Sequence, residues 1–195
     1  MITKSDLSRM LSCVTDDGEK ISERLFEKYG DFERIFSEDA DNLISVSKNP
    51  DTAVFIKLAL ALSKRKITDS FKFNVPHTTQ EIEEYLFALF FCENEEKIYA
   101  ITIDARGRVT KCKLLGVGDV GQAQLITRKL ISLCESEDTR GVILAHNHPS
   151  GSVEPSEEDV IATKRIKELL DGINVKLCLH YIYSGHKKST VMIEE

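Results

Sequence analysis

The spacing of apolar residues separates a helical first third of the chain from a second part in which helices and strands alternate. In the first third, helical spacing recurs in three segments: "ISERLFEKYG", "DFERIFSEDADNLISVS" and "DTAVFIKLALALSKRK". We expect Gly30 to end the first of these helices and Asp51 to cap the last one. The helical period then breaks in "ITDSFKFNVPH". The pattern therefore predicts an all-helical domain over residues 1–70 and a second domain over residues 75–195.

The second part of the chain predicts an α/β domain. Strand patterns occur in "KIYAITIDA" and "RVTKCKLLG", which a turn joins, in the apolar run "GVILAHNH", and in "VKLCLHYIY", the expected final strand. Helical spacing returns in "TTQEIEEYLFALFFC", which opens on the capping pair Thr78 and Glu81, and in "QAQLITRKLISLC". It returns once more in "SEEDVIATKRIKELLDG", where Gly172 is the expected stop.

Composition excludes several classes of protein. The chain has 195 residues, of which 42% are hydrophobic and 30% charged, as is usual for a soluble globular protein. No apolar run reaches the roughly 18 residues that a membrane helix needs, and the N-terminus lacks the apolar core of a signal peptide. We therefore expect a cytoplasmic protein with no membrane segment. The five scattered cysteines have no C-x-x-C spacing, so they predict neither a disulfide framework nor a cysteine-based zinc site, and most should be buried apolar residues.

The charge of the chain disfavours nucleic acid as a partner. The net charge is −6, whereas proteins that bind nucleic acid usually carry a basic face. Residues 1–72 hold 12 Lys and Arg against 13 Asp and Glu, and 12 − 13 = −1. The densest basic cluster, Lys64 to Lys66, ends a predicted helix, where the helix dipole favours positive charge. We therefore expect weak or no nucleic-acid binding.

The stretch "HNHPSGSVEPSEED" carries the candidate chemistry. Residues i and i+2 of a strand share a side, so His146 and His148 project together if the strand persists through them. The following loop returns the chain so that Ser156 and Asp159, at the start of the next helix, face the histidines. Two imidazoles and a carboxylate make a three-ligand zinc set with an open position for water. The alternative is that S-x-x-D is an ordinary helix cap and that the histidines are polar residues at a strand end.

The pattern of H-x-H, seven residues and S-x-x-D resembles the JAMM metal motif of the JAB/MPN family, and "HNHPSG" with "PSEED" resembles its RadC branch. The resemblance covers roughly residues 75–195 and implies a mixed sheet flanked by helices. It implies that His146, His148 and Asp159 bind zinc.

The same resemblance implies roles for two further residues and a reaction. Matching "EKIYAITID" to the strand that follows the family's acid makes Glu96 the general base, whereas Glu93 and Glu95 are rivals on the residues alone. Ser156 would stabilise an oxyanion. The implied activity is zinc-dependent hydrolysis of an amide or isopeptide bond in an unknown protein or peptide substrate. The alternative is a non-enzymatic DNA-associated or adaptor protein that keeps the metal for structure.

The chain departs from the branch at several points. The final strand has Leu179-His180 where the branch has an Asp-His pair, and the helix that carries Arg128 reads Thr-Arg-Lys where the branch reads Pro-Arg-Glu. The first domain loosely resembles the helix-hairpin-helix region of the branch but lacks its glycine hairpin near "SVSKNPDTA", so it is a degenerate form. That hairpin presents backbone N–H groups to phosphate, so its loss also argues against DNA binding.

A second glycine pattern favours a turn over a cofactor site. The segment "GVGDVG", residues 116–121, matches the dinucleotide-binding pattern G-x-G-x-x-G between a strand and a helix. Asp119 would place a negative charge inside the pyrophosphate cradle. We therefore expect a glycine-rich turn and no nucleotide cofactor.

Overall fold

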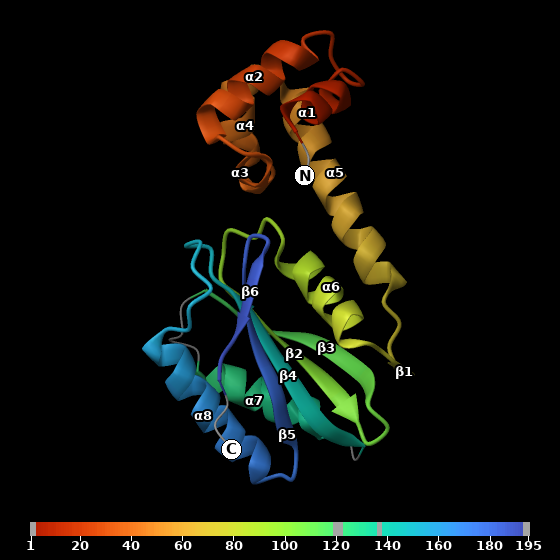
Figure 1. The fold of residues 1–195 in the computed structure, drawn as a ribbon, viewed down its shortest axis with the longest axis vertical. Helices are drawn as coiled ribbons and strands as arrows, with labels where there is room; N and C mark the ends of the chain where they lie inside the picture. The colour runs from red at the N-terminus through yellow and green to blue at the C-terminus, as the bar shows by residue number, and fades with distance from the viewer. Residues whose placement is uncertain (1–2, 119–122, 136–137, 193–195) are drawn as a thin grey trace. The chain divides into compact units, whose positions relative to one another are not determined.

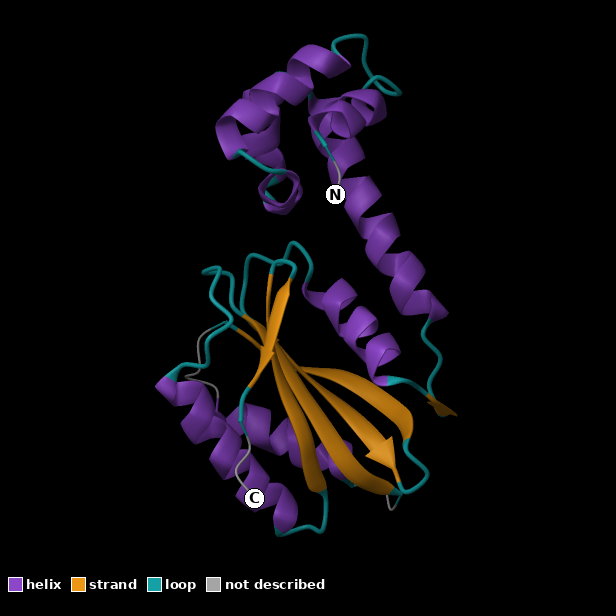
Figure 2. Cartoon of the chain, in the orientation of Figure 1, coloured by secondary structure: helices purple, strands orange, loops and turns teal. Residues whose placement is uncertain are grey.

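The computed structural model describes residues 3–118, 123–135 and 138–192. The chain divides into two compact units, Met1–Lys66 and Ile67–Glu195. The described part of the first unit consists of helices and loops, and the sheet belongs to the second unit (Figure 2). The architecture is therefore the expected one, a helical region followed by an α/β domain.

Five helices form the described part of the first unit, the last of which continues into the second: α1 (Lys4–Leu11), α2 (Gly18–Tyr29), α3 (Phe32–Ser37), α4 (Ala40–Ser47) and α5 (Pro50–Ser70). Each helix contributes fully buried aliphatic side chains: Leu7, Leu11, Ile21, Leu25, Ile35, Leu43 and Ile56. Gly30 ends α2 with a φ of +86°, a conformation that favours glycine, as expected.

The predicted limits of the longest helix were wrong at both ends. Helix α5 starts at Pro50, and the Asn49 side chain accepts hydrogen bonds from the backbone N–H groups of Asp51 and Thr52. Asn49 is thus the cap and Asp51 lies in the first turn, because proline suits the first helical position. The helix also runs through "ITDS" to Ser70, since no glycine or proline in that segment stops it.

The described part of the second unit contains a six-stranded mixed sheet in the order β1-β3-β2-β4-β5-β6. Its strands are β1 (Val75–Pro76), β2 (Lys97–Asp104), β3 (Arg108–Val117), β4 (Thr139–Asn147), β5 (Lys176–Ser184) and β6 (Lys187–Thr190). Strands β4 and β5 are parallel, and the other neighbours are antiparallel. The expectation that β5 is the final strand was wrong, because the polar segment "KKST" pairs with it as β6 although it shows no apolar alternation.

Helices cover both faces of the sheet (Figure 1). Helix α6 (Thr79–Phe90), capped by Thr78 and Glu81 as expected, packs on one face, and α7 (Ala123–Cys134) and α8 (Glu157–Asp171) pack on the other. Between β4 and β5, Val142 pairs with Leu177 but Ile143 pairs with Leu179, so Cys178 is an extra residue. This bulge turns Leu179 toward the α6 face and His180 toward the α7/α8 face.

Three further expectations concern membrane helices, the cysteines and the glycine-rich segment. Within the described ranges, no helix combines the length and the apolar character that crossing a membrane requires. None of the five cysteines is in a disulfide, but only Cys134 is buried and Cys13 is exposed, so the expectation that most are buried was wrong. In the motif "GVGDVG", Gly116 and Val117 lie in β3, whereas residues 119–121 lie outside the described residues.

Candidate metal centre

Two imidazoles meet at the carboxyl end of β4. The strand ends at Asn147, but the backbone N–H of His148 still donates to the Tyr183 carbonyl of β5 at 2.8 Å. The Ser184 hydroxyl donates to the His148 carbonyl at 2.6 Å. These bonds extend the strand geometry past its end, so both rings project to the same side, and their Nε2 atoms lie 2.9 Å apart.

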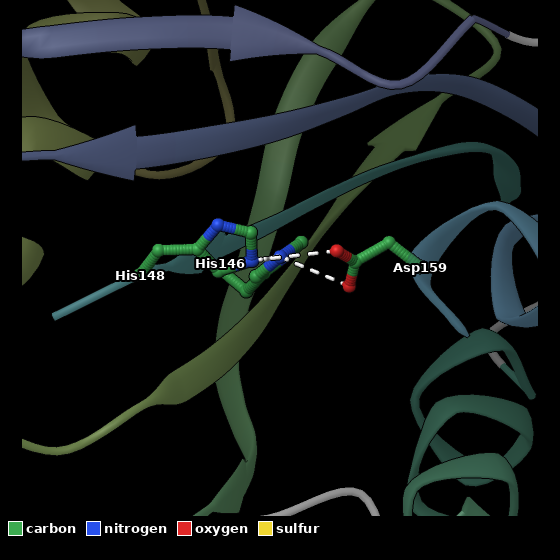
Figure 3. A group of neighbouring side chains, drawn as sticks. All are labelled: His146, His148 and Asp159. Carbon is green, nitrogen blue, oxygen red and sulfur yellow. Dashed lines mark hydrogen bonds and ion pairs between the residues drawn. The ribbon is translucent and has the colours of Figure 1, made fainter. Parts of the chain in front are cut away.

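The third potential ligand comes from the first turn of α8 (Figure 3). Asp159 places one carboxylate oxygen 3.2 Å from His146 Nε2 and the other 3.3 Å from His148 Nε2. The same residue completes a helix cap: its Oδ2 accepts hydrogen bonds from the Ser156 amide and hydroxyl, and its amide donates to Ser156 Oγ. The capping and metal-site interpretations therefore apply to the same side chain, and the cap aims the carboxylate at the histidines.

The spacing of these atoms suits a small metal ion. Tetrahedral zinc with bonds of 2.0–2.1 Å holds neighbouring ligand atoms about 3.3 Å apart. The two Nε2 atoms are 2.9 Å apart, and each lies 3.2 or 3.3 Å from a different oxygen of the Asp159 carboxylate, all close to that value. His146, His148 and Asp159 could therefore hold a metal ion.

The protonation of two of the three groups suits metal binding. His148 Nδ1 lies 3.2 Å from the Ser152 carbonyl, which can only accept, so Nδ1 carries a proton and Nε2 is the nitrogen that would offer its lone pair to a metal ion. Burial acts to raise the pKa of Asp159, but contacts with the His146 ring and with Ser156 outweigh it and lower that pKa below its ordinary value. Asp159 is therefore an ionised acceptor at neutral pH.

A buried chain of contacts lies behind His146. His146 Nδ1 is 2.9 Å from His180 Nε2, and His180 Nδ1 is 2.7 Å from the Thr163 hydroxyl oxygen. The Thr163 hydroxyl is also 2.6 Å from the Asp159 backbone carbonyl. Burial lowers the pKa of His180 to about 3, so its ring is neutral at physiological pH. By contrast Leu179, the residue that departs from the branch, packs against the apolar cluster under α6, on the opposite face of the sheet.

A cavity of about 530 Å³ adjoins the candidate ligands. His146, Asp159, His180 and Glu96 line it, together with isoleucines of β2, α7 and α8: Ile98, Ile126, Ile161 and Ile166. Among the three neighbouring acids, Glu95 is exposed and Glu93 pairs with Lys97, whereas Glu96 belongs to the cavity lining. Glu96 thus shares a cavity with His146 and Asp159, as its predicted role requires.

The side chain of Asn147, which lies between the two histidines in sequence, bonds to the backbone on both sides of Glu96. Its side-chain oxygen accepts the Lys97 amide at 2.8 Å, and its side-chain nitrogen donates to the Glu95 carbonyl at 3.0 Å. These are the backbone groups immediately after and before Glu96. One buried amide therefore connects the candidate base to the strand that carries the candidate ligands.

Sequence reasoning missed Asn147 and Thr163 and left the role of His180 open. The sequence held a signal for Asn147 and another for Thr163. Asn147 alternates with two histidines in a strand, so it must face the other side and needs polar partners there. Thr163 lies four residues after Asp159, and therefore on the same side of the helix.

Comparison with known proteins agrees with this geometry. The sequence profile of the RadC-like JAB domain matches residues 76–195. A protein of Finegoldia magna named "UPF0758 protein" is 30% identical over 143 residues, which cover 73% of this chain and 63% of that protein. Proteins of the same name are 26% identical in Aliivibrio fischeri, over 84% of this chain and 74% of that one, and 25% identical in a Janthinobacterium species, over 83% and 73%.

The chain thus spans less than two-thirds of the Finegoldia magna protein but almost three-quarters of the other two. The region matched by the domain profile contains the whole sheet except the first residue of β1, as well as the three residues that could hold a metal ion. Because that region exceeds half of the sequence, the chain belongs to the RadC-like JAB domain family.

Proposed function

We propose that this protein is a zinc-dependent hydrolase of amide or isopeptide bonds in a protein or peptide substrate. In this proposal His146, His148 and Asp159 hold the zinc, Glu96 is the general base and Ser156 donates to the oxyanion. The observation that carries the proposal is the convergence of two imidazole Nε2 atoms and one carboxylate within 3.3 Å of one another, at the edge of a cavity.

The ligand set suits catalysis better than a purely structural site. Three protein ligands leave one position of a tetrahedral ion open, whereas structural zinc sites use four. When bound, zinc acts as a Lewis acid and lowers the pKa of a coordinated water to about 7. The adjoining cavity gives water and substrate a place beside the open position.

Glu96 supplies the proton transfers in this proposal. Its carboxylate accepts a proton from the attacking water and then delivers that proton to the leaving amine. Its place in the cavity lining with His146 and Asp159 supports this role, as does the Asn147 side chain, which holds the backbone on both sides of Glu96.

Ser156 can donate to an oxyanion only after its hydroxyl turns. That hydroxyl now donates to Asp159 Oδ2 at 2.6 Å. The Ser156 amide donates to the same oxygen at 2.8 Å, so the carboxylate would keep one partner if the hydroxyl rotated toward substrate. The capping role and the proposed catalytic role are therefore compatible.

The cavity suggests the kind of substrate. Four isoleucines line it together with polar residues such as Glu158 and Arg165, and the isoleucines favour an apolar substrate side chain next to the bond that is cut. A substrate screen should therefore include peptides with branched aliphatic residues at each position around an amide or isopeptide bond.

Replacing Glu96 by glutamine tests the proposal. Glu96→Gln keeps size and polarity but removes the basic carboxylate, so we expect zinc content to stay unchanged and turnover to fall about 100- to 10,000-fold. Elemental analysis and cleavage of the best peptide from the screen measure the two quantities. Glu95→Gln is the matched control, because that neighbouring side chain is exposed, and it should retain full turnover.

Two results would contradict the proposal. Full turnover in Glu96→Gln would remove Glu96 from the chemistry, and loss of zinc in that variant would make Glu96 a ligand. If the zinc-loaded wild-type protein cleaves nothing in the screen, the alternative of a non-enzymatic protein with a structural metal is favoured.

A further inference from the structure

The Nδ1 atoms of His146 and His148 have different hydrogen-bond partners. An imidazole that binds a metal through Nε2 must carry its proton on Nδ1. For His148 the Ser152 carbonyl enforces this arrangement directly. For His146 the Nδ1 partner is His180, whose ring nitrogen can donate or accept, so this contact alone leaves the proton undecided.

We propose that Thr163 and His180 form a one-directional hydrogen-bond relay that fixes the proton of His146 on Nδ1 and presents its Nε2 lone pair to the metal. Thr163 and His180 are thus positioning residues that act through His146. This inference rests on the proposed metal site.

The direction of the relay follows from the Thr163 hydroxyl. A 2.6 Å separation between two oxygen atoms requires a hydrogen between them, and the Asp159 backbone carbonyl has none to offer. The single hydroxyl proton of Thr163 therefore points to that carbonyl. The Thr163 oxygen is left as an acceptor, so the 2.7 Å contact with His180 requires a proton on His180 Nδ1.

The remaining steps follow from the burial of His180, which is 3% exposed and whose two ring contacts are the His146 ring and the Thr163 hydroxyl. Neither contact supplies a negative charge that would offset a buried imidazolium, so the ring is neutral. A neutral imidazole with its proton on Nδ1 has a lone pair on Nε2. His180 Nε2 must then accept at the 2.9 Å contact, and His146 Nδ1 must donate. In the reverse direction the Thr163 hydroxyl would donate to His180. No proton would then lie between the Thr163 hydroxyl oxygen and the Asp159 backbone carbonyl oxygen, which are 2.6 Å apart and would repel each other.

Burial and connectivity keep the relay in place. Thr163, His180 and His146 are each 3% exposed or less. Thr163 is one helical turn after Asp159, so the carbonyl that anchors the relay belongs to another candidate ligand. The relay therefore joins two metal ligands through the protein interior, and the bulge at Cys178 makes this possible by turning His180 to that face.

The relay can be tested without substrate or metal. Long-range ¹H–¹⁵N NMR spectra of the metal-free wild-type protein at neutral pH distinguish a protonated ring nitrogen from one with a lone pair. We expect the His180 signals to show the proton on Nδ1 and the lone pair on Nε2. A proton on His180 Nε2 would overturn the proposal.

Two variants of Thr163 test its effect on metal binding. Thr163→Val keeps the shape of the side chain but removes the hydroxyl, and Thr163→Ser is the control that keeps the hydroxyl. Changes to groups that orient a metal ligand typically reduce metal affinity about 10- to 100-fold, so we expect a loss of that size in Thr163→Val and affinity near wild type in Thr163→Ser. Competition with a chelating indicator measures zinc affinity, and circular dichroism checks the fold.

The outcomes separate this inference from the proposed function. Equal zinc affinity in the Thr163→Val variant and the wild type would overturn the relay, and so would an equal loss in both Thr163 variants. If the wild type binds no zinc, the proposed function fails, whereas the NMR signals of His180 still decide the direction of the relay.

Discussion

Strands β4 and β5 carry different chemistry on their two faces. On the α6 face, Ala145 pairs in register with Tyr181, and both belong to an apolar and aromatic cluster with Tyr183. On the α7/α8 face, the same strands present His146 and His180, whose rings contact each other. Because successive side chains of a strand alternate between faces, a single residue step separates a position that stabilises the fold from one that forms the candidate site.

The comparison implies that stability and metal binding can be changed separately. The α6 face offers buried apolar side chains with no contact to the candidate ligands in the described contacts, such as Leu86. The α7/α8 face carries a second apolar cluster that includes Val142 and Leu144, and next to it the polar groups of the candidate site. Variants of the α6 face and variants of the candidate site should therefore give opposite results in a metal assay and an unfolding assay.

The largest effect is expected from the two histidines. Replacing His146 and His148 together by alanine removes two of three ligands, so bound zinc should fall from about one per chain to none. Elemental analysis after dialysis measures the metal content. Unchanged zinc in this double variant would show that the metal, if any, binds elsewhere.

The matched variant on the other face is Leu86→Ala. Leu86 is completely buried in α6, and truncating a buried leucine to alanine typically costs about 2–5 kcal/mol of unfolding free energy. Zinc content should stay at the wild-type level in the folded protein. Loss of zinc from folded Leu86→Ala would contradict the separation of the two faces.

A smaller effect is expected where the segment of Glu96 meets Asn147. Asn147→Ala removes both hydrogen bonds that bracket Glu96, so amide exchange at Lys97 should accelerate while zinc content stays unchanged. Hydrogen–deuterium exchange with mass spectrometry measures this. Asn147→Asp is the control, because it keeps an acceptor for the Lys97 amide and should protect it better than alanine does. Equal protection of Lys97 in Asn147→Ala and wild type would show that Asn147 does not hold this segment.

The smallest effect is expected at the opposite end of β2. The Arg108 amide, the Arg108 guanidinium and the Arg106 amide hold the pKa of Asp104 below its ordinary value, although burial opposes them. A lowered folded-state pKa stabilises the protein above about pH 4, and this contribution is lost as pH falls through the folded-state pKa.

Asp104→Asn should therefore have a lower melting temperature than wild type at pH 7. The difference in melting temperature should begin to narrow below about pH 4 and vanish below the folded-state pKa, where the wild-type carboxylate is also neutral. Thermal denaturation across this range measures both curves, and zinc content should not change. A difference in melting temperature that stays constant down to the lowest pH would contradict the lowered pKa of Asp104.

The sequence by itself determined the two-part architecture and the candidate metal-binding residues, because both depend on local spacing. Apolar periodicity separated the helical region from the α/β domain, and Thr78, Glu81 and Gly30 marked helix ends that the structure has. H-x-H and S-x-x-D bring the candidate ligands together through strand alternation and a helix cap, and these are short-range rules. The periodicity failed for β6 and for the ends of α5, where polar pairing and an uninterrupted helix carry no apolar signal.

Only the tertiary structure decided how residues far from the motif in sequence reach it. Glu96 precedes β2 and His180 lies in β5, and their places beside His146 depend on strand order, on the register between β2 and β4, and on one bulge in β5. A shift of one residue at that bulge would send His180 to the aromatic face and leave His146 Nδ1 without its partner. Strand register is set by the packing of the whole sheet, so no local pattern in the sequence could specify it.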